Sequence, residues 1–288
     1  MLERGGIFGV GLLFMITGFL AALNLDNKDA FSYIKKRIVR LWPTYACCIL
    51  ITSLTLFLFW PEKKPSIIQF LLNFTMIQKL FGISGVDGVY WTLSVQLLFY
   101  AFIAFVIWKK LKRILPSISC VWLLLAITLS IFKRLEINNG IVKLASLLFA
   151  SDYIAMLIIG MIFALLYEGT KVKQIGLIIV LSVINQILAL GIINAGLFVI
   201  NMLLMFLVVR NIQPPKIIAN KAVLYFASIS YPFYLLHCKI GYVIIRALKY
   251  KGITTEWSLV IPFIMILILS SIVHQYIEKP SSQLIKIL

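Results

Sequence analysis

"GIFGVGLLFMITGFLAAL", residues 6–23, contains no charged residue. At a helical rise of about 1.5 Å per residue, such a stretch crosses most of the roughly 30 Å hydrocarbon core of a bilayer. Apolar windows of this kind recur along the chain, and we predict membrane spans at 7–23, 43–60, 89–108, 116–132, 149–167, 174–190, 192–209, 230–249 and 257–276. The sequence therefore predicts an all-α fold, a polytopic transmembrane helical bundle of about nine spans.

The composition of the whole chain supports a membrane protein. Of its 288 residues 62% are hydrophobic and only 13% are charged, and the mean hydropathy is +1.03. A soluble domain carries about a quarter charged residues. Short loops join most of the windows, and neither a repeat nor an added soluble segment interrupts them. We predict a single integral-membrane domain over residues 1–288.

The charge distribution indicates orientation rather than a nucleic-acid partner. The net charge of +17 is spread between the spans, so no basic domain exists that could form a nucleic-acid groove. If the N-terminus lies outside, the inward loops carry more Lys and Arg than the outward loops, which predicts a cytoplasmic C-terminus. The four cysteines have no metal-ligand spacing, and we expect no metal site.

Arg37 and Arg40 lie three residues apart before the second span, so they share one face of a helix. Two guanidinium groups at the mouth of a bundle can bind phosphates bidentately. They are also typical of the basic anchors that flank a span. Spacing alone leaves both interpretations open.

"SYPFYLLHCK", residues 230–239, places one of only two histidines in an apolar window. We expect Ser230 to cap a helix that starts there, which puts His237 roughly 10 Å along the helix, on the same face as Tyr234. A histidine inside a bilayer needs a cavity or a partner, so His237 is either a functional residue or a hydrogen-bonded packing residue.

Three further polar or aromatic residues are candidates for the outer or inner face. Trp91 suits the interface at the start of the third span, and Gln96 lies deeper, where it either joins helices or faces a wet cavity. Glu278 follows the last span, just after His274. It can form an exposed charge pair of little energetic weight with Lys279.

Five segments together resemble integral-membrane acyltransferase family 3, in the order typical of that family. They are "GVGLLFMITGFL" (9–20), "FSYIKKRIVRLWP" (31–43), "YWTLSVQLLFY" (90–100), "SISYPFYLLH" (228–237) and "YIEKP" (276–280). Each segment is weak alone, whereas five in order over nearly the whole chain are specific. The resemblance implies a membrane O-acyltransferase in a bacterial-type plasma (inner) membrane.

The chain departs from the family pattern at three places. The family has about ten spans, and its first helix, which carries an Arg and a His resembling the catalytic base, has no counterpart here, so we expect an N-terminally truncated domain. Gly11 replaces an Asp that many members have, and Gln96 replaces a Glu. Because an amide does not titrate, Gln96 cannot act as a general acid or base.

The resemblance implies transfer of an acyl group, most simply acetyl, from a cytoplasmic acyl-CoA to a hydroxyl of a cell-surface polysaccharide or lipid-linked glycan. Arg37 and Arg40 would bind the donor's phosphates, His237 would act as base or acyl carrier, and Tyr234 would donate a hydrogen bond. Acetyl-CoA would be a co-substrate and no cofactor would stay bound. Two alternatives stay open, namely an inactive truncated family member and a transporter for a glycan or lipid.

Overall fold

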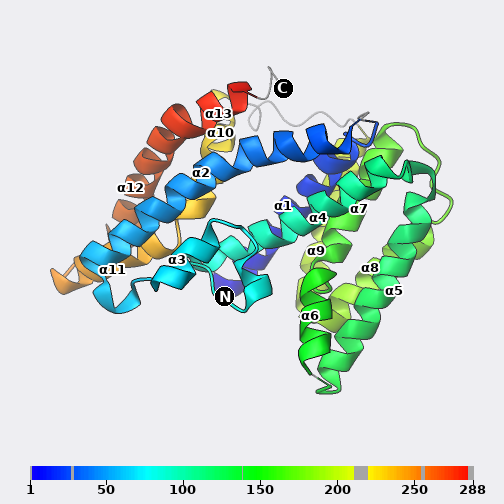
Figure 1. Cartoon of the computed structure of the whole chain (residues 1–288), viewed down its shortest axis with the longest axis horizontal. Coiled ribbons are helices and arrows are strands. Elements are labelled where there is room, and N and C mark those ends of the chain that lie inside the picture. Colours follow the sequence, from blue (N-terminus) through cyan, green and yellow to red (C-terminus); the bar gives the residue numbers. More distant parts are fainter. Residues whose placement is uncertain (1, 27–28, 138, 211–219, 254–256, 285–288) are drawn as a thin grey trace. The chain divides into compact units, whose positions relative to one another are not determined.

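The computed structural model describes residues 2–26, 29–137, 139–210, 220–253 and 257–284, and these ranges contain helices and no strand (Figure 1). The all-α prediction is therefore confirmed. The chain divides into two compact units, a first unit of residues 1–33 and 95–213 and a second unit of residues 34–94 and 214–288. The single domain over 1–288 stays a prediction.

The first unit is built around one helix that is apolar on every side. Its helices are α1 (Leu2–Ala22), most of α4 (Trp91–Trp108), the short turn η4 (Lys112–Ile114), α5 (Leu115–Arg134), α6 (Gly140–Leu148), α7 (Ile154–Tyr167), α8 (Ile175–Leu190) and α9 (Ile192–Val209). Every residue of α7 from Ile154 to Leu165 is buried. Because α1, α5, α8 and α9 all pack against it, α7 needs no polar face.

Two glycines allow α1 and α7 to pack with their backbones in contact. A Cβ atom at Gly18 would collide with the carbonyl of Leu157, and one at Gly160 would collide with the carbonyl of Met15. Small residues at such positions are the usual means of close helix approach in membranes, where apolar burial from water no longer drives association. Further along α1, the Asn201 side chain of α9 donates to the Phe8 carbonyl at 3.0 Å.

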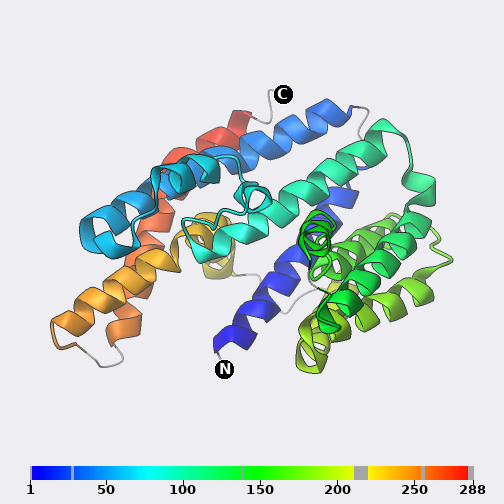
Figure 2. The ribbon, with the colours of Figure 1, turned by 60° about the horizontal axis from the view of Figure 1, so that its bottom comes forward.

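The second unit contains the C-terminal helices and most of α2 (Ala30–Phe59). Its other elements are η1 (Pro61–Lys63), α3 (Ile67–Asn73), η2 (Gln78–Phe81), η3 (Gly88–Tyr90), α10 (Lys221–Leu236), α11 (Lys239–Tyr250), α12 (Trp257–Val273), the π-helical turn η5 (His274–Glu278) and α13 (Lys279–Leu284). Helix α12 packs against both α10 and α11 (Figures 1 and 2).

The segment after α2 folds back along that helix. The Trp42 indole donates to the Phe74 carbonyl at 3.0 Å, although Phe74 follows the far end of α2 in sequence. The Tyr45 and Tyr90 rings meet edge to face, and the hydroxyls of Thr52 and Tyr90 lie 3.3 Å apart. These contacts hold the segment against α2, and the Trp42 bond satisfies a backbone carbonyl just after α3.

The predicted span over 230–249 is wrong as one continuous helix. Helix α10 begins at Lys221, where the Asn220 side chain accepts from the Val223 N–H, and it ends at Leu236. Ser230 therefore lies inside α10 and does not cap it; its hydroxyl donates to the Ala227 carbonyl at 2.7 Å. The predicted start comes too late because it takes Ser230 as the cap and Pro232 as an early helical residue, whereas the cap is Asn220.

The Asp87 carboxylate stabilises the break between α10 and α11. One carboxylate oxygen accepts from the Lys239 N–H, the first of α11, at 2.8 Å, and the other accepts from the Val89 N–H at 3.2 Å. A carboxylate suits a helix N-terminus, where free N–H groups carry partial positive charge. Burial raises the pKa of the Asp87 carboxyl, while the two backbone hydrogen bonds act in the opposite direction.

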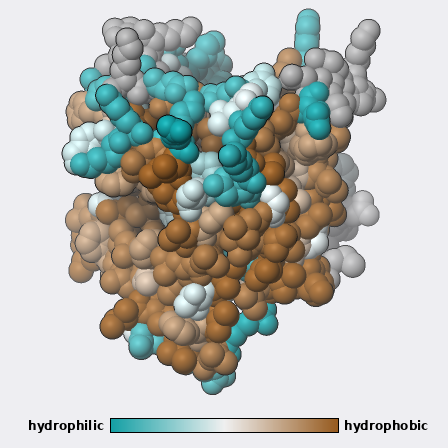
Figure 3. Space-filling view, turned by 90° about the vertical axis from the view of Figure 1, so that its right-hand side faces the viewer, coloured by the Kyte–Doolittle hydropathy of each residue, from teal (hydrophilic) through white to brown (hydrophobic). Residues whose placement is uncertain are grey.

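Within the described ranges, four helices are long and apolar enough to cross a membrane, and they cover 30–59, 88–108, 112–134 and 257–284. Shorter apolar helices lie at 6–22, 154–167, 175–190 and 192–207. Figure 3 shows the face on the right of Figure 1, where α5 and α8 lie, with a broad apolar surface and hydrophilic residues gathered towards its upper edge. The apolar windows of the sequence thus form the helices of a multi-pass membrane protein.

Replacing Gly18 or Gly160 by Val should separate α1 from α7, because the added side chain meets a backbone carbonyl that cannot move aside. Overpacking of this kind costs about 3 kcal/mol. We expect a lower thermal unfolding temperature of the detergent-solubilised protein. Gly9→Val is the matched control, since a Cβ at this exposed glycine of α1 meets nothing within 4 Å. Equal unfolding temperatures of the Gly18, Gly160 and Gly9 variants would contradict the backbone contact between α1 and α7.

Replacing Asp87 by Ala should destabilise the break between α10 and α11, because the Lys239 and Val89 N–H groups both lose their acceptor. The expected loss is about 2 kcal/mol or more, with faster hydrogen exchange at the Lys239 amide. Asp29→Ala is the control, since exposed Asp29 accepts from the Phe31 and Ser32 N–H groups at the start of α2. Loss of that exposed cap costs about 1 kcal/mol. Unchanged exchange at Lys239 would refute the role of Asp87.

Candidate active site

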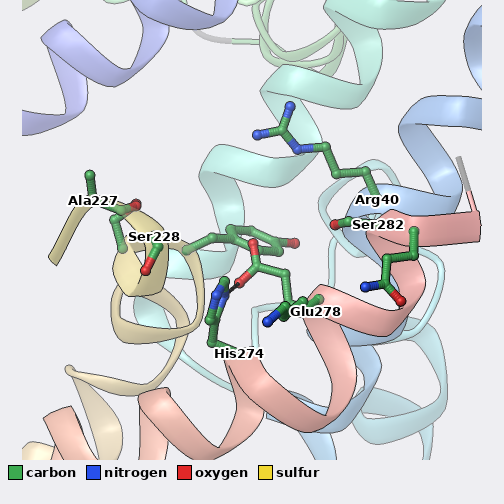
Figure 4. Close-up of a pocket in the computed structure, with 10 residues that line it drawn as sticks. Arg40, Ala227, Ser228, His274, Glu278 and Ser282 are labelled. Atoms are coloured by element: carbon green, nitrogen blue, oxygen red, sulfur yellow. Dashed lines mark hydrogen bonds and ion pairs between the residues drawn. The ribbon is translucent and has the colours of Figure 1, made fainter. Parts of the chain in front are cut away.

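An open cavity of about 700 Å³ lies within the second unit, where three parts of the chain meet (Figure 4). Arg40 comes from α2, a run of serines and a tyrosine comes from α10, and a polar set comes from η5 and α13. The lining residues are Arg40, Ala227, Ser228, Ser230, Tyr231, His274, Glu278, Lys279, Ser282 and Gln283. An intramembrane or membrane-mouth cavity this polar is a candidate for binding or catalysis.

His274 and Glu278 form the shortest side-chain pair of the cavity. The imidazole Nδ1 lies 2.7 Å from Oε2 of Glu278, and the side chains are 25% and 12% exposed. Figure 4 shows the two groups pointing toward one another from the same helical segment. Glu278 is therefore no exposed partner of Lys279 as the sequence suggested; its carboxylate binds an imidazole beside a cavity.

The pair lies on a π-helical turn, and the sequence provides a cause for it. The Lys279 N–H donates to the His274 carbonyl five residues back. Pro280 has no N–H for the carbonyl four residues before it, which removes one α-helical hydrogen bond at this point. Single π-helical turns inside α-helices occur frequently at functional sites.

Positive charge dominates the mouth of the cavity. Arg40 and Lys279 are exposed cations on its rim, and its one carboxylate among the lining residues, Glu278, is engaged by His274. Such a rim favours an anion, and a planar guanidinium can bind a phosphate bidentately. Arg37 lies one turn earlier on α2 and is partly buried; it is not among the lining residues.

Three hydroxyl groups of the cavity wall, all on α10, are already engaged as donors. Ser228 Oγ donates to the Tyr225 carbonyl and Ser230 Oγ to the Ala227 carbonyl, each at 2.7 Å. Tyr231 Oη donates to the Leu41 carbonyl of α2 at 3.0 Å. These three groups hold the wall in place, and α10 is tied to α2 through Tyr231.

Tyr234 lies on α10 and His237 caps its end, roughly 4.5 Å and 9 Å along the helix beyond Tyr231, the last residue of α10 in the cavity lining. The His237 Nδ1 is 2.8 Å from the Tyr234 carbonyl, and the imidazole stacks on Phe233. The Tyr234 hydroxyl lies 3.0 Å from Thr92 Oγ1. His237 lies beside the Asp87 loop and is not among the residues that line the cavity of Arg40, and its role as a base stays a prediction.

The two remaining predicted residues fall in different units. Trp91 begins α4 in the second unit, with the Lys79 ammonium 5.2 Å from its ring centroid. Gln96 belongs to the first unit and is buried on α4. The acceptor-side roles of Trp91 and Gln96 stay predictions. Sequence reasoning missed His274, although its spacing of four residues before Glu278 and the nearby Pro280 were visible signals.

Comparison with known proteins gives one family and one curated relative. The model of the acyltransferase domain family matches residues 2–275, so the "YIEKP" segment lies just beyond the match. Nodulation protein 10 of Rhizobium leguminosarum bv. viciae is 28% identical over 127 residues, which cover 36% of this chain and 35% of that protein. The chain thus aligns with about a third of that relative's length. No solved structure matches the chain.

The family match extends over nearly all of the chain and contains four of the five segments that the sequence analysis singled out. The helical architecture and the apolar surface are those of a multi-pass membrane protein. The chain belongs to integral-membrane acyltransferase family 3.

Proposed function

We propose that the protein is a membrane O-acyltransferase that uses the cavity of the second unit to bind an acyl-CoA. The acyl group, most simply acetyl, would pass to a hydroxyl of a cell-surface polysaccharide or a lipid-linked glycan. The observation that carries the proposal is the combination of a cationic rim with an imidazole–carboxylate pair in one cavity of a chain from an acyltransferase family.

The rim suits the phosphates of the donor. Arg40 supplies a guanidinium and Lys279 an ammonium, and both side chains are exposed where a large ligand can reach them. Arg37, one turn away on α2, would be a further phosphate ligand. With the orientation favoured by the positive-inside rule, this end of α2 and the C-terminus face the cytoplasm of a bacterial-type plasma (inner) membrane, where acyl-CoA is found.

The chemistry needs a base for the hydroxyl proton and a hydrogen-bond donor for the developing oxyanion. The sequence assigns these roles to His237 and Tyr234. Because the His237 Nδ1 faces the Tyr234 carbonyl, its Nδ1 carries the proton and Nε2 stays available as a base. Trp91 and Gln96 would lie on the acceptor side. These assignments stay proposals.

One assay separates an acyltransferase from an inactive family member and from a glycan transporter. Membranes that contain the protein are supplied with radiolabelled acetyl-CoA, and label is measured in the carbohydrate and glycolipid fractions. An acyltransferase labels them above membranes that lack the protein. An inactive family member or a glycan transporter transfers no label, and that result would overturn the proposal.

Arg40→Ala should raise the KM for acetyl-CoA roughly 10- to 100-fold with a smaller change in kcat, because it removes charge-assisted hydrogen bonds to phosphate worth about 1.5–3 kcal/mol. The KM comes from initial rates of label transfer. Arg113→Ala is the matched control, since it removes the same charge from an exposed position of η4 in the first unit. A KM that is unchanged in Arg40→Ala, or equally raised in both variants, would exclude Arg40 as a donor ligand.

A further inference from the structure

We infer that His274, oriented by Glu278, is the general base that removes the proton from the acceptor hydroxyl. This inference rests on the proposed acyl transfer and adds a catalytic residue that the family resemblance did not supply. Its starting point is the cavity itself, because His274 and Glu278 both line it.

The geometry of the pair fixes the imidazole. With Nδ1 2.7 Å from the Glu278 carboxylate, the proton of a neutral imidazole lies on Nδ1, and Nε2 carries the free lone pair. The carboxylate also stabilises the imidazolium that forms when Nε2 takes a proton, as the buried carboxylate does in hydrolase triads. A base, a group that orients it and an adjacent cavity are the elements of an acid–base site.

Other groups of the cavity are poorly suited to this role. Arg40 and Lys279 are cations and have no lone pair to offer. The hydroxyls of Ser228, Ser230 and Tyr231 already donate to backbone carbonyls. The other two polar lining residues, Ser282 and Gln283, carry a neutral hydroxyl and an amide, neither of which acts as a general base at neutral pH. Among the described lining residues, the His274–Glu278 pair is therefore the site for accepting a proton.

The step balances without an added reactant. The acceptor hydroxyl gives its proton to His274 Nε2 while its oxygen bonds to the thioester carbonyl carbon. The tetrahedral intermediate then expels the CoA sulfur as the carbon–sulfur bond breaks, and the imidazolium returns the proton to that sulfur. The products are the ester and free CoA thiol, and His274 is regenerated. Arg40 and Lys279 would hold the CoA phosphates throughout.

A purely structural interpretation of the same pair makes a different prediction. An imidazole and a carboxylate four residues apart can simply hold the π-helical turn closed, as helical side-chain pairs do. In that case, a small base added to a variant that lacks the His274 imidazole would not restore activity. Rescue of a truncated side chain by a small base in solution therefore separates the two interpretations.

The test uses the full-length protein in membranes with radiolabelled acetyl-CoA, and it compares His274→Ala with His237→Ala. A general base contributes roughly 100- to 10,000-fold, so His274→Ala should lose at least about 100-fold in kcat, and added imidazole should recover part of that loss. Glu278→Gln should also lose activity, because an amide does not stabilise the imidazolium. Gln275→Ala, an exposed neighbour on the same turn, is the control for local disruption and should keep its activity.

Each outcome has a defined meaning. Full activity of His274→Ala, or a loss that imidazole does not relieve, overturns the inference while the acyltransferase function stands. Loss and imidazole rescue in His237→Ala alone would move the base to His237. Absence of label transfer by the unaltered protein refutes the proposed function itself and the inference with it.

A second measurement does not depend on activity. The chain has two histidines, so His237→Ala leaves His274 as the only imidazole for nitrogen-15 NMR of the purified protein. We expect the Nδ1–H tautomer, and we expect Glu278→Gln to change it. A spectrum dominated by the Nε2–H tautomer with Glu278 intact would overturn the inference, even if the variants at His274 fold poorly.

Discussion

Every interruption of a helix in a bilayer leaves backbone N–H and carbonyl groups that water cannot reach, and each must find a partner in the protein. The second unit meets this constraint with a side chain at one interruption and with a changed helical turn at the other. Where α10 ends, the Asp87 carboxylate accepts from the first N–H of α11. Where α12 ends, the Lys279 N–H donates to the His274 carbonyl in a π-helical turn, directly before Pro280, which has no N–H to donate. The π-helical turn carries His274 and Glu278, both of which line the cavity.

The first unit relies mainly on close helix packing, although side chains also satisfy its helix ends: Arg134 donates to the Leu188 carbonyl at 2.7 Å and Asn185 to the Ser151 carbonyl at 3.1 Å. Helix α7 has no polar face, and contact between its backbone and that of α1 requires the glycines at 18 and 160. This contact holds α1 and α7 rigidly together, because neither helix can move away without leaving an unfilled void. Ion pairs at the ends of the helices add to it: Lys112 contacts both Asp26 and Glu168, and Lys133 contacts Asp152. The polar residues that line the cavity all belong to the second unit, and the first unit contributes none of them.

Sequence reasoning predicted the helices well where a continuous apolar window coincides with one helix, as for α1 and α7 to α9. It failed at α10, because the residue that stabilises the break, Asp87, lies 152 positions before Lys239, and no local pattern contains that contact. It also began the second span too late, since α2 continues through the basic residues at 35–40 beyond its apolar part. Within the cavity, Arg40 and Glu278 were predicted and His274 was not. The spacing of His274 and Glu278 was visible, but only the folded chain brings Arg40 to the same cavity.

The two histidines differ in the group that faces Nδ1, and this difference bears on which of them does acid–base work. At His237 the partner is the Tyr234 carbonyl, which fixes the tautomer but carries no charge to offset an imidazolium. The nearby Asp87 carboxylate interacts with His237 through its charge, but its two oxygens accept from the Lys239 and Val89 N–H groups. At His274 the partner is a carboxylate with little solvent exposure, which both fixes the tautomer and stabilises the protonated ring. A base must carry the proton for part of the reaction. His274, whose carboxylate partner stabilises the imidazolium, is therefore better suited than His237 to act as the general base.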